Sequence, residues 1–173
     1  EIPFDGLTWM FDHCETITPR NIDRVKALGG GIAIQHRMAF QGEYFVDRYG
    51  AEAAKLTPPI QRMLASGVPV GAGTDATRVA SYNPWTALYW LVSGRTVGGL
   101  RLYDAGSRLS RDTALELWTT GSAWFSNEKD KKGRIQEGMD LLDAALAAAT
   151  GGETQDPRVL GDVGKAGVAI DSV

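Results

Sequence analysis

Three short apolar runs alternate with amphipathic segments over the first two-thirds of the chain. The runs cover residues 7–13, 32–36 and 68–73, and each is mainly apolar rather than cleanly alternating. Such runs are typical of strands that are covered on both faces. The segments between them place apolar residues at helical spacing. The pattern therefore predicts strand–helix–strand–helix–strand–helix, which is an α/β protein with a parallel sheet.

Helix boundaries follow from capping and breaking residues. A Thr–Pro or Asn–Pro pair commonly starts a helix, because the first side chain caps free N–H groups and proline suits the first turn. Glycine commonly ends one. Helices are therefore expected to open at Thr18, Thr57, Asn83 and Ser110, with stops at Gly29 and Gly67.

Residues 37–49 are expected to form a loop that carries four aromatic side chains, at Phe40, Tyr44, Phe45 and Tyr49. Loops held by a rigid scaffold often carry binding residues. We therefore predict that this loop covers the mouth of a site and sets specificity. A packed surface loop is the alternative.

Composition and charge exclude several classes of function. A chain of 173 residues, 43% hydrophobic and 23% charged, is expected to form one globular domain. The net charge of −3, a pI near 5.4 and the lack of a basic stripe argue against nucleic acid as a partner. No apolar run reaches the ~18 residues of a membrane helix, so no membrane partner is expected. The lone Cys14 excludes an internal disulfide and fits a reducing, cytoplasmic compartment.

Both histidines of the chain stand at the ends of predicted strands, and an aspartate stands at the end of the third. Because the carboxyl ends of parallel strands share one rim, His13, His36 and Asp75 are expected to converge. A strand-end histidine that only hydrogen-bonds a loop is the alternative for each. Cys14 neighbours His13, but strand alternation points its side chain elsewhere, which favours a buried bystander.

The glycine-rich corner at Gly71, Gly73 and Ala76 also fits a phosphate-binding pattern, G-x-G-x-x-A. In that interpretation the chain is a dinucleotide-binding domain. Asp75 would then place a negative charge against the phosphates, where a helix N-terminus should help. The acidic residue expected about 20 positions later is also missing.

Five motifs carry a resemblance to a known family. They are the segments FDHCET at 11–16, GIAIQH at 31–36, GAGTDA at 71–76, LSRDTAL at 109–115 and KGRIQEG at 132–138. Together they resemble the C-terminal part of a metal-dependent amidohydrolase, most closely the amidohydrolase 3 (YtcJ-like) branch. The resemblance implies the C-terminal portion of a (β/α)8 TIM barrel, a partial barrel with strands six to eight and their helices.

The resemblance also implies roles for individual residues. His13 matches a metal ligand and Asp75 matches an aspartate that contacts the metal and shuttles protons. His36 matches a position assigned here to substrate binding. Arg37 and Arg78 follow rim residues and are candidates to meet an anionic group of the substrate, with solvated arginines as the alternative.

The family's chemistry requires a divalent metal, with zinc expected, which lowers the pKa of bound water to about 7. The resulting metal-bound hydroxide would hydrolyse a non-peptide C–N bond in a small amide or cyclic amide. Asp75 would take a proton from the water and deliver it to the leaving amine.

The sequence departs from the family in two ways. It lacks the first-strand His-x-His pair, the strand-four bridging residue and the strand-five histidine, and a full barrel takes ~250 residues. After Met139 it enters an alanine-rich stretch, which suggests a truncated or frame-shifted reading or a natural variation. The expected division is 1–128 as barrel, 129–139 as the return to a small β-sandwich and 140–173 as an atypical tail.

These departures predict a fragment that is inactive alone. Its partners would be a missing N-terminal half of the barrel or a second copy in a homo-oligomer. A non-catalytic interaction domain is the alternative.

Overall fold

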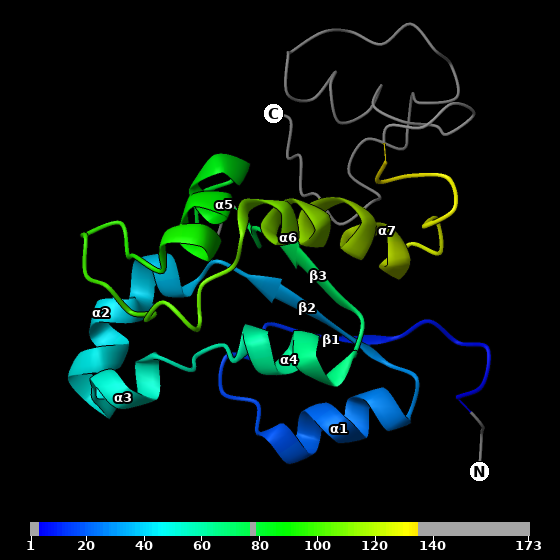
Figure 1. Cartoon of the computed structure of the whole chain (residues 1–173), viewed down its shortest axis with the longest axis horizontal. Coiled ribbons are helices and arrows are strands. Elements are labelled where there is room, and N and C mark those ends of the chain that lie inside the picture. The colour runs from blue at the N-terminus through cyan, green and yellow to red at the C-terminus, as the bar shows by residue number, and fades with distance from the viewer. Residues whose placement is uncertain (1–3, 77–78, 135–173) are drawn as a thin grey trace, which may run out of the picture.

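The computed structural model describes residues 4–76 and 79–134, and it contains a parallel three-stranded sheet (Figure 1). The strands are β1 (Met10–Asp12), β2 (Gly31–Gln35) and β3 (Val70–Gly73), in the order β1-β2-β3. Met10 pairs with Gly31, and Ile32 pairs with Val70. The predicted α/β fold with a parallel sheet is confirmed, and the sheet is open rather than closed into a barrel.

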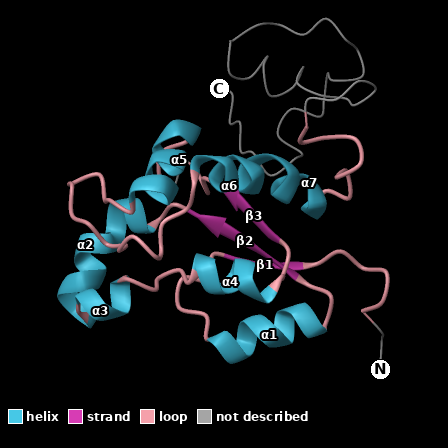
Figure 2. Ribbon diagram, in the orientation of Figure 1, coloured by secondary structure: helices cyan, strands magenta, loops and turns pink. Residues whose placement is uncertain are grey.

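Helices flank the strands on both sides in the view of Figure 2, with α1 and α4 below and α5, α6 and α7 above. The helices are α1 (Pro19–Ala27), α2 (Met38–Tyr49), α3 (Ala51–Ala54), α4 (Ile60–Ser66), α5 (Pro84–Ser93), α6 (Arg111–Glu116), the π-helical turn η1 (Leu117–Gly121) and α7 (Ser122–Phe125). No helix in the described ranges is both long and apolar enough to cross a membrane.

Three predicted helix starts are confirmed by their caps. The Thr18 side chain accepts a hydrogen bond from the Asn21 N–H at 3.4 Å, and Asn83 accepts one from the Trp85 N–H at 2.9 Å. Ser110 accepts one from the Thr113 N–H at 3.0 Å. These signals are local in sequence, which is why they can be identified without tertiary information.

The predicted start at Thr57 is wrong. Its hydroxyl donates to the Ala53 carbonyl at 2.6 Å, so Thr57 closes α3 instead of capping a new helix. Helix α4 begins at Ile60 and ends as expected at Gly67, which has a φ of 74°.

The predicted loop at 37–49 is also wrong, because most of this stretch forms α2. Met38, Ala39 and Gly42 are buried on one side of this helix. A Cβ at Gly42 would collide with the Leu102 side chain, so α2 approaches the 96–102 segment closely. This packing against a distant segment decides the conformation, and the local aromatic content does not reveal it.

The hydrophobic core lies on one face of the sheet. Strand alternation places Ile32 and Ile34 of β2 on the same face as Val70 of β3, and all three are buried. Trp90 and Leu91 of α5 belong to the same core cluster. On the opposite face, the Phe125 ring of α7 packs over Gly31 and Gly71, and the polar strand-end residues described below lie nearer the carboxyl ends.

The two edges of the sheet differ. At β3, the Ser122 hydroxyl of α7 donates to the Ala72 carbonyl at 3.0 Å. At β1, Met10 and Phe11 are 43% and 53% exposed. The β1 edge is therefore open while helical residues cover the β3 edge. Of the predicted return at 129–139, residues 129–134 form turns and bends, and the rest lies outside the described residues, as does the tail 140–173.

Candidate active site at the carboxyl ends of the strands

The carboxyl ends of β1 and β3 bring His13 and Asp75 together. The His13 N–H donates to the Ala33 carbonyl at 2.8 Å, which extends the β1–β2 ladder by one residue. His13 Nδ1 then lies 3.8 Å from Asp75 Oδ2, and the two side chains are 39% and 42% exposed. The expected convergence of these two residues is confirmed by the geometry.

Both residues have left-handed backbone conformations. The φ angle is 69° at His13, 55° at Cys14 and 51° at Asp75. Such angles cost a non-glycine residue about 1–3 kcal/mol and cluster at functional sites. Asp and His are among the residues enriched there. The chain thus turns sharply at His13 after β1 and at Asp75 after β3, and these turns present both side chains at the rim.

This pair fits part of a metal site. His13 Nδ1 is buried and has no hydrogen-bond partner among the described residues, so its lone pair is available in the neutral ring. Two ligands bonded to one zinc ion at about 2.0–2.2 Å lie no more than about 4.4 Å apart. The observed 3.8 Å satisfies this limit. Within residues 4–76 and 79–134, however, no cluster of three or more His, Cys, Asp or Glu side chains could hold a metal.

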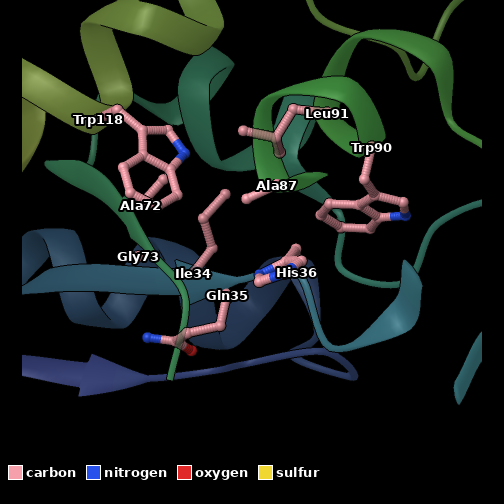
Figure 3. A pocket seen from close by; sticks show the side chains of 9 residues that line it. All are labelled: Ile34, Gln35, His36, Ala72, Gly73, Ala87, Trp90, Leu91 and Trp118. Atoms are coloured by element: carbon pink, nitrogen blue, oxygen red, sulfur yellow. The ribbon is translucent and has the colours of Figure 1, made fainter. Parts of the chain in front are cut away.

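Two further polar residues lie on the same face of the sheet. Gln35 Nε2 lies 3.5 Å from Asp12 Oδ1, at the outer limit of a hydrogen bond. In Figure 3 the Gln35 side chain points to the opposite side of β2 from Ile34. The sequence interpretation missed Asp12 and Gln35, although strand alternation alone would have placed both on this face.

His36 is placed differently from His13 and Asp75. It is 1% exposed and lies among apolar side chains on the Ile34 face of the sheet, beside Trp90 and Leu91 of α5 (Figure 3). The gaps between these side chains are too narrow for a water molecule. Burial lowers the pKa of His36 below its usual 6.5, and the nearby Gly73 backbone opposes that shift. The ring is therefore neutral at pH 7, and the structure does not bring it to the His13–Asp75 pair.

The other residues singled out in the sequence are Arg37, Arg78 and Cys14, and none of them is placed at the His13–Asp75 pair by a described contact. Arg37 Nε donates to Gln41 Oε1 at 3.1 Å at the start of α2, and Arg78 lies outside the described residues. Burial, followed by the charges of Glu15 and Asp12, raises the pKa of Cys14 to about 11. The Cys14 thiol is thus protonated at neutral pH, which agrees with a bystander.

Buried polar atoms without partners concentrate near the strand ends. Among the described residues they are His13 Nδ1, Glu15 Oε1, Gln35 Oε1, both ring nitrogens of His36, Trp90 Nε1 and Trp118 Nε1. Such atoms are uncommon in folded proteins and often mark a place for a ligand, ion or water. Glu15, the third of the carboxylates near this rim, was also missed by the sequence interpretation.

A sequence profile described as "Amidohydrolase family" matches residues 3–140. The chain belongs to the amidohydrolase family. It is also similar to an uncharacterized metal-dependent hydrolase from Pyrococcus furiosus, with 28% identity and a TM-score of 0.61. A second uncharacterized metal-dependent hydrolase, from Pyrococcus horikoshii OT3, has the same fold, with 22% identity and a TM-score of 0.62. Each comparison covers 75% of this chain and 26% of the other chain.

One curated protein is similar over a shorter stretch. Methylmalonyl-CoA mutase from Escherichia coli K12 is 41% identical over 85 residues, which cover 45% of this chain and 12% of the mutase. This amidohydrolase-family chain thus spans only a small part of every relative named here.

The glycine corner of this amidohydrolase-family chain is not built as a phosphate loop. Gly71 and Gly73 lie within β3, and α5 begins only at Pro84. The Phe125 ring occupies the space in front of Gly71. The glycines therefore allow close helix packing, whereas a dinucleotide site needs the corner to lead directly into a helix N-terminus.

Proposed function

We propose that this chain contributes part of the active site of a metal-dependent hydrolase that cleaves non-peptide C–N bonds in amides or cyclic amides. Its sheet would correspond to strands six to eight of a (β/α)8 barrel. The observation that carries the proposal is the approach of His13 Nδ1 to Asp75 Oδ2 at 3.8 Å, with the nitrogen buried and without a hydrogen bond among the described residues. Membership of the amidohydrolase family supports the reaction class.

In this proposal His13 and Asp75 hold a divalent ion, with zinc expected. A divalent ion at such a site lowers the pKa of bound water and polarises a carbonyl oxygen. Asp75 is 42% exposed, so its carboxylate is accessible to accept a proton and return it to the leaving amine. Gln35 would hold the Asp12 carboxylate beside the pair.

We further propose that the chain is inactive alone. The active hydrolase would be a larger assembly that is soluble and cytoplasmic. A catalytic zinc site uses about three protein ligands and keeps one position open. His13 and Asp75 supply two. The remaining ligands would come from more of the parent polypeptide or from a second copy.

Zinc titration by isothermal calorimetry tests the ligand assignment. We expect the whole chain to bind zinc more weakly than micromolar, because the ligand set is incomplete. His13→Ala and Asp75→Ala should each weaken binding at least about tenfold, since even outer-shell partners of a metal contribute that much. Asp47→Ala, an exposed carboxylate on α2, is the control and should leave the affinity unchanged.

Two results would contradict this proposal. Sub-micromolar affinity of the unaltered chain would show a complete site that we have not identified. Equal affinity in the unaltered chain and in His13→Ala would remove His13 from the site and favour a non-catalytic domain.

A further inference from the structure

An open cleft of about 440 Å³ lies between the loop after β1 and helices α2 and α3. Its volume falls within the ~300–1,000 Å³ of typical small-molecule pockets. The side chains that line it are Thr16, Ile17, Phe45, Tyr49, Ala53, Leu56 and Thr57. It is separate from the narrow space around His36.

The lining of this cleft is apolar and carries no charge. The rings of Phe45 and Tyr49 have centroids 4.7 Å apart and form one wall. Leu56 and Tyr49 are 65% and 58% exposed, so a large apolar surface is left open. Of the hydroxyl groups, that of Thr57 already donates to the Ala53 carbonyl. Such a surface favours an uncharged hydrophobic group and disfavours a carboxylate or ammonium group, which would lose its hydration there.

One end of the cleft is close to the candidate catalytic pair along the chain. Thr16 stands three residues after His13, and a chain of that length spans at most about 11 Å. The Ile17 N–H donates to the Cys14 carbonyl at 3.2 Å, so a turn shortens the distance further. In Figure 1 the arrowheads of β2 and β3 point toward the side where α2 lies, which is the rim that carries His13 and Asp75.

We propose that this cleft is the specificity pocket of the site and receives an uncharged alkyl or aryl substituent of the amide substrate. The proposal rests on the proposed hydrolase function, because it assigns the reacting amide to the His13–Asp75 pair. It excludes substrates whose substituent is charged. Helix α2, which supplies the aromatic wall, would then determine the size of substituent that fits.

Binding of neutral amides to the whole chain tests this assignment without requiring turnover. The probes are acetamide, benzamide and 4-carboxybenzamide, and the affinity of each is measured by chemical-shift titration in NMR. We expect benzamide to bind at least about tenfold more tightly than acetamide, because the ring buries additional apolar surface. The carboxylate of the third probe should cancel that gain.

The variants separate the cleft from the rest of α2. Tyr49→Ala and Leu56→Glu should each weaken benzamide binding at least about fivefold while leaving acetamide unchanged, since they remove or charge the apolar wall. Tyr44→Ala is the matched control, because Tyr44 is an exposed tyrosine on the same helix that does not line the cleft. Circular dichroism of each variant verifies that it is folded.

The proposal is overturned if benzamide binds no better than acetamide, or if Tyr49→Ala behaves like Tyr44→Ala. A third result would also overturn it: benzamide does not bind, and sedimentation shows self-association that Leu56→Glu abolishes. A second copy of the chain would then occupy the cleft. Zinc affinity of His13→Ala, measured separately, reports on the proposed hydrolase function, so failure of one proposal is distinguishable from failure of the other.

Discussion

The two histidines of the chain occupy contrasting environments at the residue scale. His13 is partly exposed, and its Nδ1 faces the carboxylate of Asp75 at 3.8 Å. His36 is buried with an edge-on contact to Phe40, at a ring-centroid distance of 5.5 Å. An imidazole beside a carboxylate can share a cation with it, whereas an imidazole in an apolar environment is costly to protonate.

The buried state of His36 predicts a pH-dependent stability. Because the folded-state pKa lies below the usual 6.5, the unfolded chain binds a proton that the folded chain does not. The free energy of unfolding should therefore fall as the pH drops below about 6.5, by at most about 1.4 kcal/mol per pH unit from this group. Stability contributed by the neutral ring is fully present above that pH.

Urea unfolding at pH 7.5 and pH 5.5 measures this effect, with His36→Leu as the comparison. The variant should lose the part of the pH dependence that His36 causes. It should be about as stable at pH 7.5, because leucine suits the apolar surroundings of His36 and gives up no more than a weak polar contact with the Gly73 backbone. An identical pH dependence in both proteins would show that His36 is accessible to protonation.

At the scale of elements, the contact between β3 and the helical segment from η1 to α7 positions the rim. A Cβ at Gly71 would lie 2.5 Å from Phe125 Cε2 and 3.1 Å from the Ser122 Cα. The Ser122 hydroxyl also caps the Ala72 carbonyl on the free edge of β3. The strand that ends in Asp75 is thus held by helix packing in place of a fourth strand.

Gly71→Ala is accordingly expected to destabilise the fold by about 1–3 kcal/mol through overpacking. Phe125→Leu in the same chain should recover part of that loss, because the smaller side chain makes room for the new methyl group. Thermal or urea unfolding of the single and double variants gives the coupling free energy. Gly106→Ala, where the nearest atom lies at an ordinary 3.6 Å, is the control. Strictly additive effects would contradict the packing described here.

The elements also show which parts of the fold are predictable. Three helix starts are predictable from their capping residues, Thr18, Asn83 and Ser110. Each cap and the N–H that it accepts from lie within three residues of each other. Helix α2 was missed because its burial depends on contacts with Leu102, about 60 positions along the chain. Thr57 was misassigned because its hydroxyl turns back to Ala53.

The same distinction applies to the site. The convergence of His13 and Asp75 follows from parallel strands alone, because both residues stand at carboxyl ends. His36 also stands at such an end, but alternation along β2 turns it to the same face as Ile34, where α5 packs. Among the described residues, Glu15 Oε1 is buried without a hydrogen-bond partner. Its position depends on the geometry of the loop after β1, which no local sequence pattern encodes.

At the scale of the whole molecule, the described residues form an open sheet on which the two proposed metal ligands, His13 and Asp75, stand at the carboxyl ends of the strands. The chain corresponds to 26% of the length of each hydrolase structure that it resembles. Its β1 edge is exposed, and its described residues offer no group of three metal ligands. The proposed function therefore requires that His13 and Asp75 act together on a single metal ion.

The imidazole nitrogens report on this shared metal ion most directly, because the chain contains only two histidines. Multiple-bond ¹H–¹⁵N spectra of the ¹⁵N-labelled chain, recorded at pH 7.5 with increasing zinc, resolve both rings. We predict that His13 Nδ1 shifts with zinc, that Asp75→Asn greatly reduces this shift, and that His36 does not respond. A zinc response at His36 alone, or none at His13 with millimolar zinc, would contradict a metal ion shared by His13 and Asp75.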